Sequence, residues 1–149
     1  QRYIICATPA YLAQYGRPNH ADEIGRHRLI DRGHSNSMRG GRELLTPAHA
    51  AGATFALECD DCDARRLSVL QGLGIALMPD WSVGPDIGAG RLVELTLDGL
   101  LPQTPGGIYL LRATQRASAK VKAFCTHLTA SIGAPPSWQL AMAGNLAQA

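Results

Sequence analysis

Apolar positions follow the clearest pattern in residues 59–81. Leu67, Leu70 and Leu73 recur at the spacing of one helix face. The next apolar residues are consecutive, at positions 75–78, and a short continuous run of this kind is typical of a strand buried on both faces. The pattern therefore predicts a helix followed by an inner strand of an α/β sheet.

Polar residues and glycines mark the ends of this unit. Asp60 or Asp61 can cap the helix by accepting its first free backbone N–H groups. Gly72 and Gly74 supply the left-handed or closely packed backbone where the helix ends. A helix N-terminus that follows a strand is also where α/β folds place ligands.

Helices and strands alternate along the rest of the chain, which favours the α/β class. Thr8 and Ser118 are expected to cap helices, and Gly16 and Gly133 to end them. The other expected helices lie at 22–27, after residue 79 and at 137–149, and the other expected strands at 1–6, 29–30, 54–58, 91–97 and 108–111.

Composition and charge exclude several classes of protein. Hydrophobic residues make up 46% of the 149 and charged residues 17%, which is a globular composition sufficient for one domain. The net charge is +2, and the arginines are interleaved with acids, whereas nucleic-acid binding requires a concentrated basic face. No apolar run has the length of a membrane span.

The start of the chain and its cysteines bear on where the protein works. Gln1 opens what is expected to be a strand already under way, without a start methionine or a secretory signal, so we expect a fragment or a processed form. The four cysteines are too few and too scattered for a disulfide framework. A reducing cytoplasm is the expected location.

Three blocks of sequence resemble a known family. They are Thr-Pro-Ala-Tyr-Leu at 8–12, with Gly-Arg-Pro at 16–18 and Asp-Glu-Ile-Gly-Arg-His at 22–27; Asp-Asp at 60–61, with Gly-Leu-Gly-Ile-Ala-Leu-Met-Pro at 72–79; and Ala-Gly-Arg-Leu-Val at 89–93, with Ile-Tyr at 108–109 and Val-Lys-Ala-Phe at 121–124. In this order the blocks resemble the effector-binding domain of LysR-type transcriptional regulators. That domain is a two-lobed fold similar to type 2 periplasmic binding proteins.

The resemblance implies a division of the chain. Residues 1–8 would be a strand remnant of lobe one, 9–112 the complete lobe two with a mixed sheet flanked by helices, 113–133 the return to lobe one, and 134–149 a tail. The winged helix-turn-helix, the linker helix and the first part of lobe one would be absent. DNA would be bound only through that absent domain.

The resemblance also implies a function. A small-molecule effector, expected to be a small organic acid, would bind between the lobes, with no cofactor, no membrane and no catalysis. Homo-oligomers are expected. The effector-binding residues would be Thr8, Asp31, Arg32, Gly33, Cys59, Asp60 and Asp61. Asp60 stands where the family usually has asparagine.

Two other functions compete with effector sensing. Cys59 and Cys62 have the C-x-x-C spacing of a thiol redox switch or of part of a metal site, although the neighbouring acids disfavour a thiolate and zinc would need two more ligands. A solute-binding protein of the same fold is the other alternative. An enzyme is not expected, because no nucleophile elbow, phosphate loop or dinucleotide fingerprint is present.

The helix that follows Ser118 carries an apolar face that the absent part of lobe one would normally cover. Val121, Phe124 and Leu128 lie on this face. We expect the face either to self-associate or to pack against the segment that contains Trp138.

Overall fold

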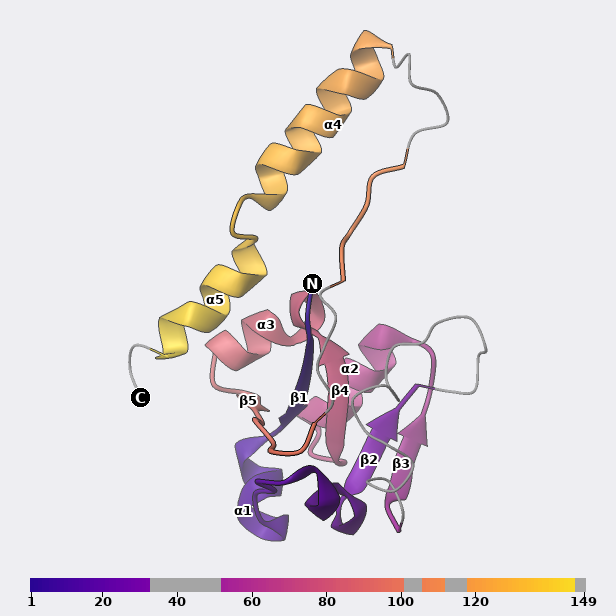
Figure 1. Cartoon of the computed structure of the whole chain (residues 1–149), viewed down its shortest axis with the longest axis vertical. Helices are drawn as coiled ribbons and strands as arrows, with labels where there is room; N and C mark the ends of the chain where they lie inside the picture. Colours follow the sequence, from indigo (N-terminus) through magenta and orange to yellow (C-terminus); the bar gives the residue numbers. More distant parts are fainter. Residues whose placement is uncertain (33–51, 101–105, 112–117, 147–149) are drawn as a thin grey trace.

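The computed structural model describes residues 1–32, 52–100, 106–111 and 118–146. They form a mixed five-stranded sheet, in the order β3-β2-β4-β1-β5, with helices on both faces, as the α/β prediction requires (Figure 1). The strands are β1 (Tyr3–Ala7), β2 (Arg28–Asp31), β3 (Thr54–Glu58), β4 (Ile75–Pro79) and β5 (Val93–Glu94). The helices are α1 (Pro9–Tyr15), the 3-10 helix η1 (Ala21–Arg26), α2 (Cys62–Leu70), α3 (Asp80–Gly88), α4 (Ala119–Ile132) and α5 (Ser137–Leu146).

Strand directions define two ends of the sheet. β2 runs parallel to both β3 and β4, whereas β1 runs antiparallel to β4 and to β5. In this register Tyr3 lies opposite Pro79, and Cys6 lies opposite Ala76. The carboxyl ends of β2, β3 and β4 therefore share one edge of the sheet with the start of β1, and the end of β1 lies at the other edge.

Capping side chains lie where the sequence predicts them. The hydroxyl of Thr8 accepts from the Tyr11 N–H at 3.2 Å, and the Asp61 carboxylate accepts from the Ala64 N–H at 2.7 Å. Ser118 caps α4 in the same way. Each bond satisfies a backbone donor that the helix leaves free.

Glycines end α2 for two different reasons. Gly72 has a φ of +72°, which side-chain-bearing residues rarely adopt. At Gly74 a Cβ atom would overlap the backbone carbonyl of Arg28 on the neighbouring strand. The predicted left-handed and closely packed positions are therefore both confirmed.

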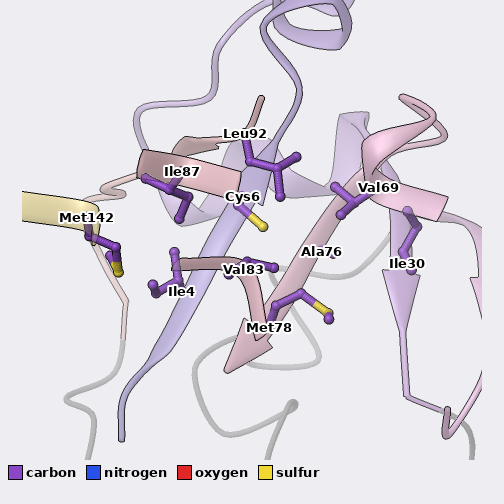
Figure 2. Packing of buried hydrophobic residues seen from close by; sticks show 10 residues of the cluster. All are labelled: Ile4, Cys6, Ile30, Val69, Ala76, Met78, Val83, Ile87, Leu92 and Met142. Carbon is purple, nitrogen blue, oxygen red and sulfur yellow. The ribbon is translucent and has the colours of Figure 1, made fainter. Parts of the chain in front are cut away.

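Both faces of the sheet are covered by apolar side chains. Alternate residues of β1 point to opposite faces, so Ile4 enters one hydrophobic cluster and Ile5 the other. Figure 2 shows the first cluster, to which α2, α3 and α5 contribute; α1 and η1 cover the second. The first consists of Ile4, Cys6, Ile30, Val69, Ala76, Met78, Val83, Ile87, Leu92 and Met142.

Two expectations for the second half of the chain are wrong, and so is one of the two alternatives given for the apolar face of α4. The strand expected at 91–97 is limited to Val93–Glu94, and residues 108–111 form no strand. Tyr109 and Leu111 are 79% and 89% exposed, because no neighbouring strand pairs with that segment in the described structure. The Trp138 segment does not cover the apolar face of α4 but packs against α3, so Phe124 stays 60% exposed.

A buried ion-pair cluster joins α2, α3 and the segment that follows α3. Asp86 is fully buried and accepts two hydrogen bonds from Arg66, at 2.6 and 2.9 Å, and two from Arg91, at 2.9 and 2.6 Å. A buried carboxylate needs such partners because burial without them is costly. This cluster holds the start of the segment 91–97 against the helices.

We predict that Asp86→Ala lowers the free energy of unfolding by about 3–5 kcal/mol, because it leaves the guanidinium of Arg66 partly buried without its partner. The comparison is Glu94→Ala, which removes the more exposed pair with Arg2 and should cost less than about 1 kcal/mol. Urea unfolding of both variants measures the difference. Equal losses would contradict this assignment.

The buried His27 ring gives the fold a pH dependence. Its Nδ1 lies 3.3 Å from the Tyr11 hydroxyl, which accepts the Arg28 N–H at 3.0 Å. Burial disfavours the charged imidazolium and so lowers the pKa of His27 from its ordinary 6.5, although Glu23 opposes the shift. The unfolded chain then binds the proton first, and stability falls as the pH drops below about 6.5 towards the folded-state pKa.

We predict that His27→Gln flattens the dependence of the melting temperature on pH between about pH 7 and 5, because the differential proton uptake is removed. His127→Gln, at an exposed position of α4, is the matched control and should keep the wild-type slope. An identical slope in the wild type and in His27→Gln would show that His27 does not contribute.

Candidate functional site

The carboxyl edge of the sheet brings together polar residues from two strands. Asp31 ends β2, and Cys59 follows the end of β3. The Cys59 N–H donates to the backbone carbonyl of Asp31 at 3.0 Å, which fixes the two strand ends side by side. Asp60 and Asp61 follow at once and lead into α2.

Arg32 is the cationic side chain at this edge. Its backbone N–H donates to the Asp31 carboxylate at 2.7 Å, and its Nε lies 3.5 Å from a carboxylate oxygen of Asp60. The Arg32 side chain is 28% exposed, whereas that of Asp60 is 50% exposed. Nε is buried without a hydrogen-bond partner in the described part of the chain. Arg32 is thus held near Asp60 by a long ion pair and retains donor capacity.

The two neighbouring aspartates have different environments. Asp61 caps α2 through the Ala64 N–H, so its carboxylate is committed to the helix. Asp60 faces Arg32 and keeps half of its side-chain surface in solvent. Of the two acids, Asp60 is the one that a molecule bound at Arg32 would meet.

Two segments far apart in the sequence lie side by side near this same edge. The amino group of Gln1 donates to the Gly106 carbonyl at 2.9 Å, and the Gly106 N–H donates back to the Gln1 carbonyl at 3.0 Å. The Asp80 N–H, directly after β4, donates to the Arg2 carbonyl at 2.9 Å. The segments at Gln1 and at Gly106 are therefore paired beyond the carboxyl end of β4.

Thr8 is not brought together with the other predicted site residues. It follows the end of β1, and its hydroxyl lies beside Gly72 at the far end of α2. Nine helical residues, about 13 Å of helix, separate that end from the Asp61 cap. Thr8 is also buried and used as a cap. Gly33 lies outside the described residues.

Asp80 is a buried acid that the sequence analysis missed. It is fully buried at the start of α3, where one carboxylate oxygen accepts from the Gln139 side chain at 3.3 Å. The other oxygen has no hydrogen-bond partner in the described structure. The sequence does carry a signal for Asp80. An acid stands at the end of a buried strand there, as it does at Asp31.

The cysteines do not form a recognisable redox or metal centre. All four are free thiols, and the Cys62 thiol donates to the Ser82 hydroxyl at 3.5 Å. In the described ranges, no group of three or more His, Cys, Asp or Glu side chains is placed to hold a metal ion. The geometry adds no support for chemistry at Cys59 and Cys62.

Comparison with known proteins identifies the family. The LysR substrate binding domain matches residues 1–133. The chain belongs to this family. The transcriptional regulator DmlR of Escherichia coli strain K12 is 27% identical over 121 residues, which cover 79% of this chain and 39% of DmlR. CrgA of Neisseria meningitidis serogroup C strain 8013 is 23% identical over 132 residues, 89% of this chain and 44% of CrgA.

Solved LysR-type structures share the fold. The CrgA regulatory domain from Neisseria meningitidis has a TM-score of 0.53 at 26% identity and covers 63% of this chain and 46% of its own. The AphB regulatory domain from Vibrio vulnificus has a TM-score of 0.51 at 25% identity and covers 62% and 48%. The LysR-family chain described here spans about two fifths of the curated regulators it matches. Within the described residues, no helix is both long and apolar enough to cross a bilayer.

We predict that Cys6 resists Ellman's reagent in the folded protein, because burial raises the pKa of its thiol to about 12 and the thiolate is the reactive form. The half-buried Cys59, Cys62 and Cys125 account for all native labelling, and the fourth thiol reacts only in denaturant. Cys6→Ala is the control and should give the same native count but one thiol fewer after unfolding. Loss of a native label in Cys6→Ala would contradict the assignment.

Proposed function

We propose that this LysR-family domain binds a small-molecule effector at the carboxyl edge of its sheet, against a second lobe, and relays binding to an attached DNA-binding domain. One observation carries this proposal: Gln1 pairs with Gly106 near the edge that holds Asp31, Arg32, Cys59, Asp60 and Asp61. A second lobe connected through the segments at Gln1 and Gly106 would face that edge. The relay needs no chemistry on the ligand, only a higher affinity for one arrangement of the lobes.

The effector class follows from Arg32. A guanidinium binds a carboxylate through two parallel N–H···O bonds, which is stronger than the single 3.5 Å contact with Asp60. The carboxylate of a small organic acid would therefore replace Asp60 as the partner of the Arg32 guanidinium. The same exchange makes the affinity depend on Asp60, because its negative charge competes with the ligand.

The division into lobes, the assembly and the compartment belong to the same proposal. Residues 9–112 would form lobe two, and residues 1–8 and 113–133 would belong to lobe one. A homo-oligomer in the cytoplasm would bind DNA through a domain outside this chain. The names of the relatives, which are transcriptional regulators, support this function and give no support to catalysis.

We predict that one class of small carboxylic acids raises the melting temperature of the chain, and that Arg32→Met weakens its binding by about 10- to 100-fold, as expected for lost charge-assisted hydrogen bonds. Asp60→Asn should tighten binding, because it removes the competing charge. Arg26→Met is the matched control and should leave binding unchanged. Arg26 is an exposed arginine at the end of η1, just before the start of β2 and so away from the site.

Thermal-shift titration and calorimetry of the four proteins measure these effects. Equal affinity in the wild type and in Arg32→Met would contradict the role of Arg32. Stabilisation by amines in place of acids would contradict the proposed effector class.

A further inference from the structure

Arg65 is a buried cation near the start of α2. The residue is 7% exposed, and its Nε is buried without a hydrogen-bond partner in the described part of the chain. The neighbouring Arg66 shows the contrast, because its guanidinium donates twice to Asp86. A buried donor without an acceptor costs free energy, and a charged donor costs more than a neutral one. Arg65 therefore burdens the ligand-free fold, which indicates a role in binding.

The packing of α2 on β2 places Arg65 on the same side of the sheet as Arg32. Val69 of α2 and Ile30 of β2 lie in one hydrophobic cluster (Figure 2). Arg65 precedes Val69 by four residues and so shares its helix face. Arg32 follows Ile30 by two residues and so shares its side of the sheet.

The two arginines also lie at the same level along the sheet. α2 runs antiparallel to β2, because it connects β3 to β4 and both of these strands are parallel to β2. Arg65 is therefore displaced from Val69 by about 6 Å of helix, and Arg32 from Ile30 by about 7 Å of strand, both towards the carboxyl edge. Helical side chains lean towards the helix N-terminus, so that of Arg65 extends further towards this edge. The 3.5 Å contact of the Arg32 Nε with Asp60, in the turn before α2, shows that Arg32 reaches the start of that helix.

We propose that Arg65 and Arg32 together bind an effector with two carboxylates, one held by each guanidinium. This inference rests on the proposed effector site at Arg32 and narrows its ligand class from acids to dicarboxylic acids. Such a ligand supplies acceptors for both buried Nε atoms. Each guanidinium can form two parallel N–H···O bonds with a carboxylate. Arg65 is then the residue that distinguishes a dicarboxylate from a monocarboxylate.

The acids at the start of α2 are directed elsewhere. Asp61 accepts from the Ala64 N–H and caps the helix. Asp63 is exposed and lies two residues before Arg65, a spacing at which helical side chains do not face each other. Asp60 faces Arg32, where the first carboxylate of the ligand would replace it. The second carboxylate therefore meets Arg65 without a competing contact from Asp61 or Asp63.

Dicarboxylates compared with their monoamides test the role of the second carboxylate. Malonate, succinate and glutarate are each titrated beside the monoamide that keeps the carbon chain but loses one charge. We expect the wild-type chain to bind at least one dicarboxylate about 10- to 100-fold more tightly than its monoamide, as for charge-assisted hydrogen bonds. Arg65→Met keeps an unbranched apolar stem and should abolish this preference in calorimetry. Arg26→Met, the exposed control, should retain it.

Melting temperatures without ligand separate a binding role from a structural one. Because the buried guanidinium lacks a partner, Arg65→Met should melt no lower than the wild type. Arg65→Lys keeps the charge but not the planar fork, so it should recover only part of the preference. A lower melting temperature together with an unchanged preference would assign Arg65 a structural role and overturn the inference.

The remaining outcomes distinguish this inference from the proposed function. Equal binding of dicarboxylates and monoamides by the wild type, a comparison that needs no variant, would overturn the role of Arg65 and leave the site at Arg32 standing. Failure of every mono- and dicarboxylic acid to bind the folded chain would overturn both. Binding of inorganic phosphate in place of the dicarboxylates, lost in Arg65→Met, would overturn the dicarboxylate class.

Discussion

Burial of β1 on both faces and along both edges is the constraint on which the rest of the structure depends. β1 lies between β4 and β5, and both of these strands come much later in the sequence. Ile4 and Cys6 enter one hydrophobic cluster, and Ile5 and Ala7 enter the other. Because a one-residue slip would move each side chain to the wrong face, the antiparallel register of β1 with β4 is strongly specified.

That register also determines which functional groups can act together. The start of β1 is fixed beside the end of β4, so the paired residues Gln1 and Gly106 lie near the edge that carries Asp31 and Asp60. The same register sends Thr8 to the opposite edge. A single effector cannot contact both Thr8 and Arg32 unless it spans the sheet, which supports centring the proposed site on Arg32.

The acids of this protein differ in burial and in partners. Asp86 is held by two arginines, and Asp61 is used as a helix cap. Asp60 is half exposed, and the oxygen that faces the Arg32 Nε lies 3.5 Å from it. Structural acids of this kind explain why a cluster of carboxylates in the sequence does not by itself define a ligand site.

The sequence by itself determined the elements whose signals are local. The caps at Thr8, at Ser118 and at one of Asp60 and Asp61, the glycines after α2 and the continuous apolar strand at 75–78 each depend on residues within one turn or one strand. The alternation of helices and strands indicated the α/β class, and three blocks of residues resembled the LysR family. Such features are readable because backbone capping and side-chain periodicity act over a few residues.

Tertiary structure alone decided which of these elements meet. The ion pairs of Asp86 and the burial of Asp80 join residues that the sequence keeps apart, and the exposure of residues 108–111 depends on a strand partner that no local pattern supplies. The docking of α5 on α3 was equally hidden, because Gly84 and Gly88 are ordinary helix residues until another backbone needs their space. Pairing, burial and close approach are set by the whole chain, since each requires a distant segment to occupy a defined position.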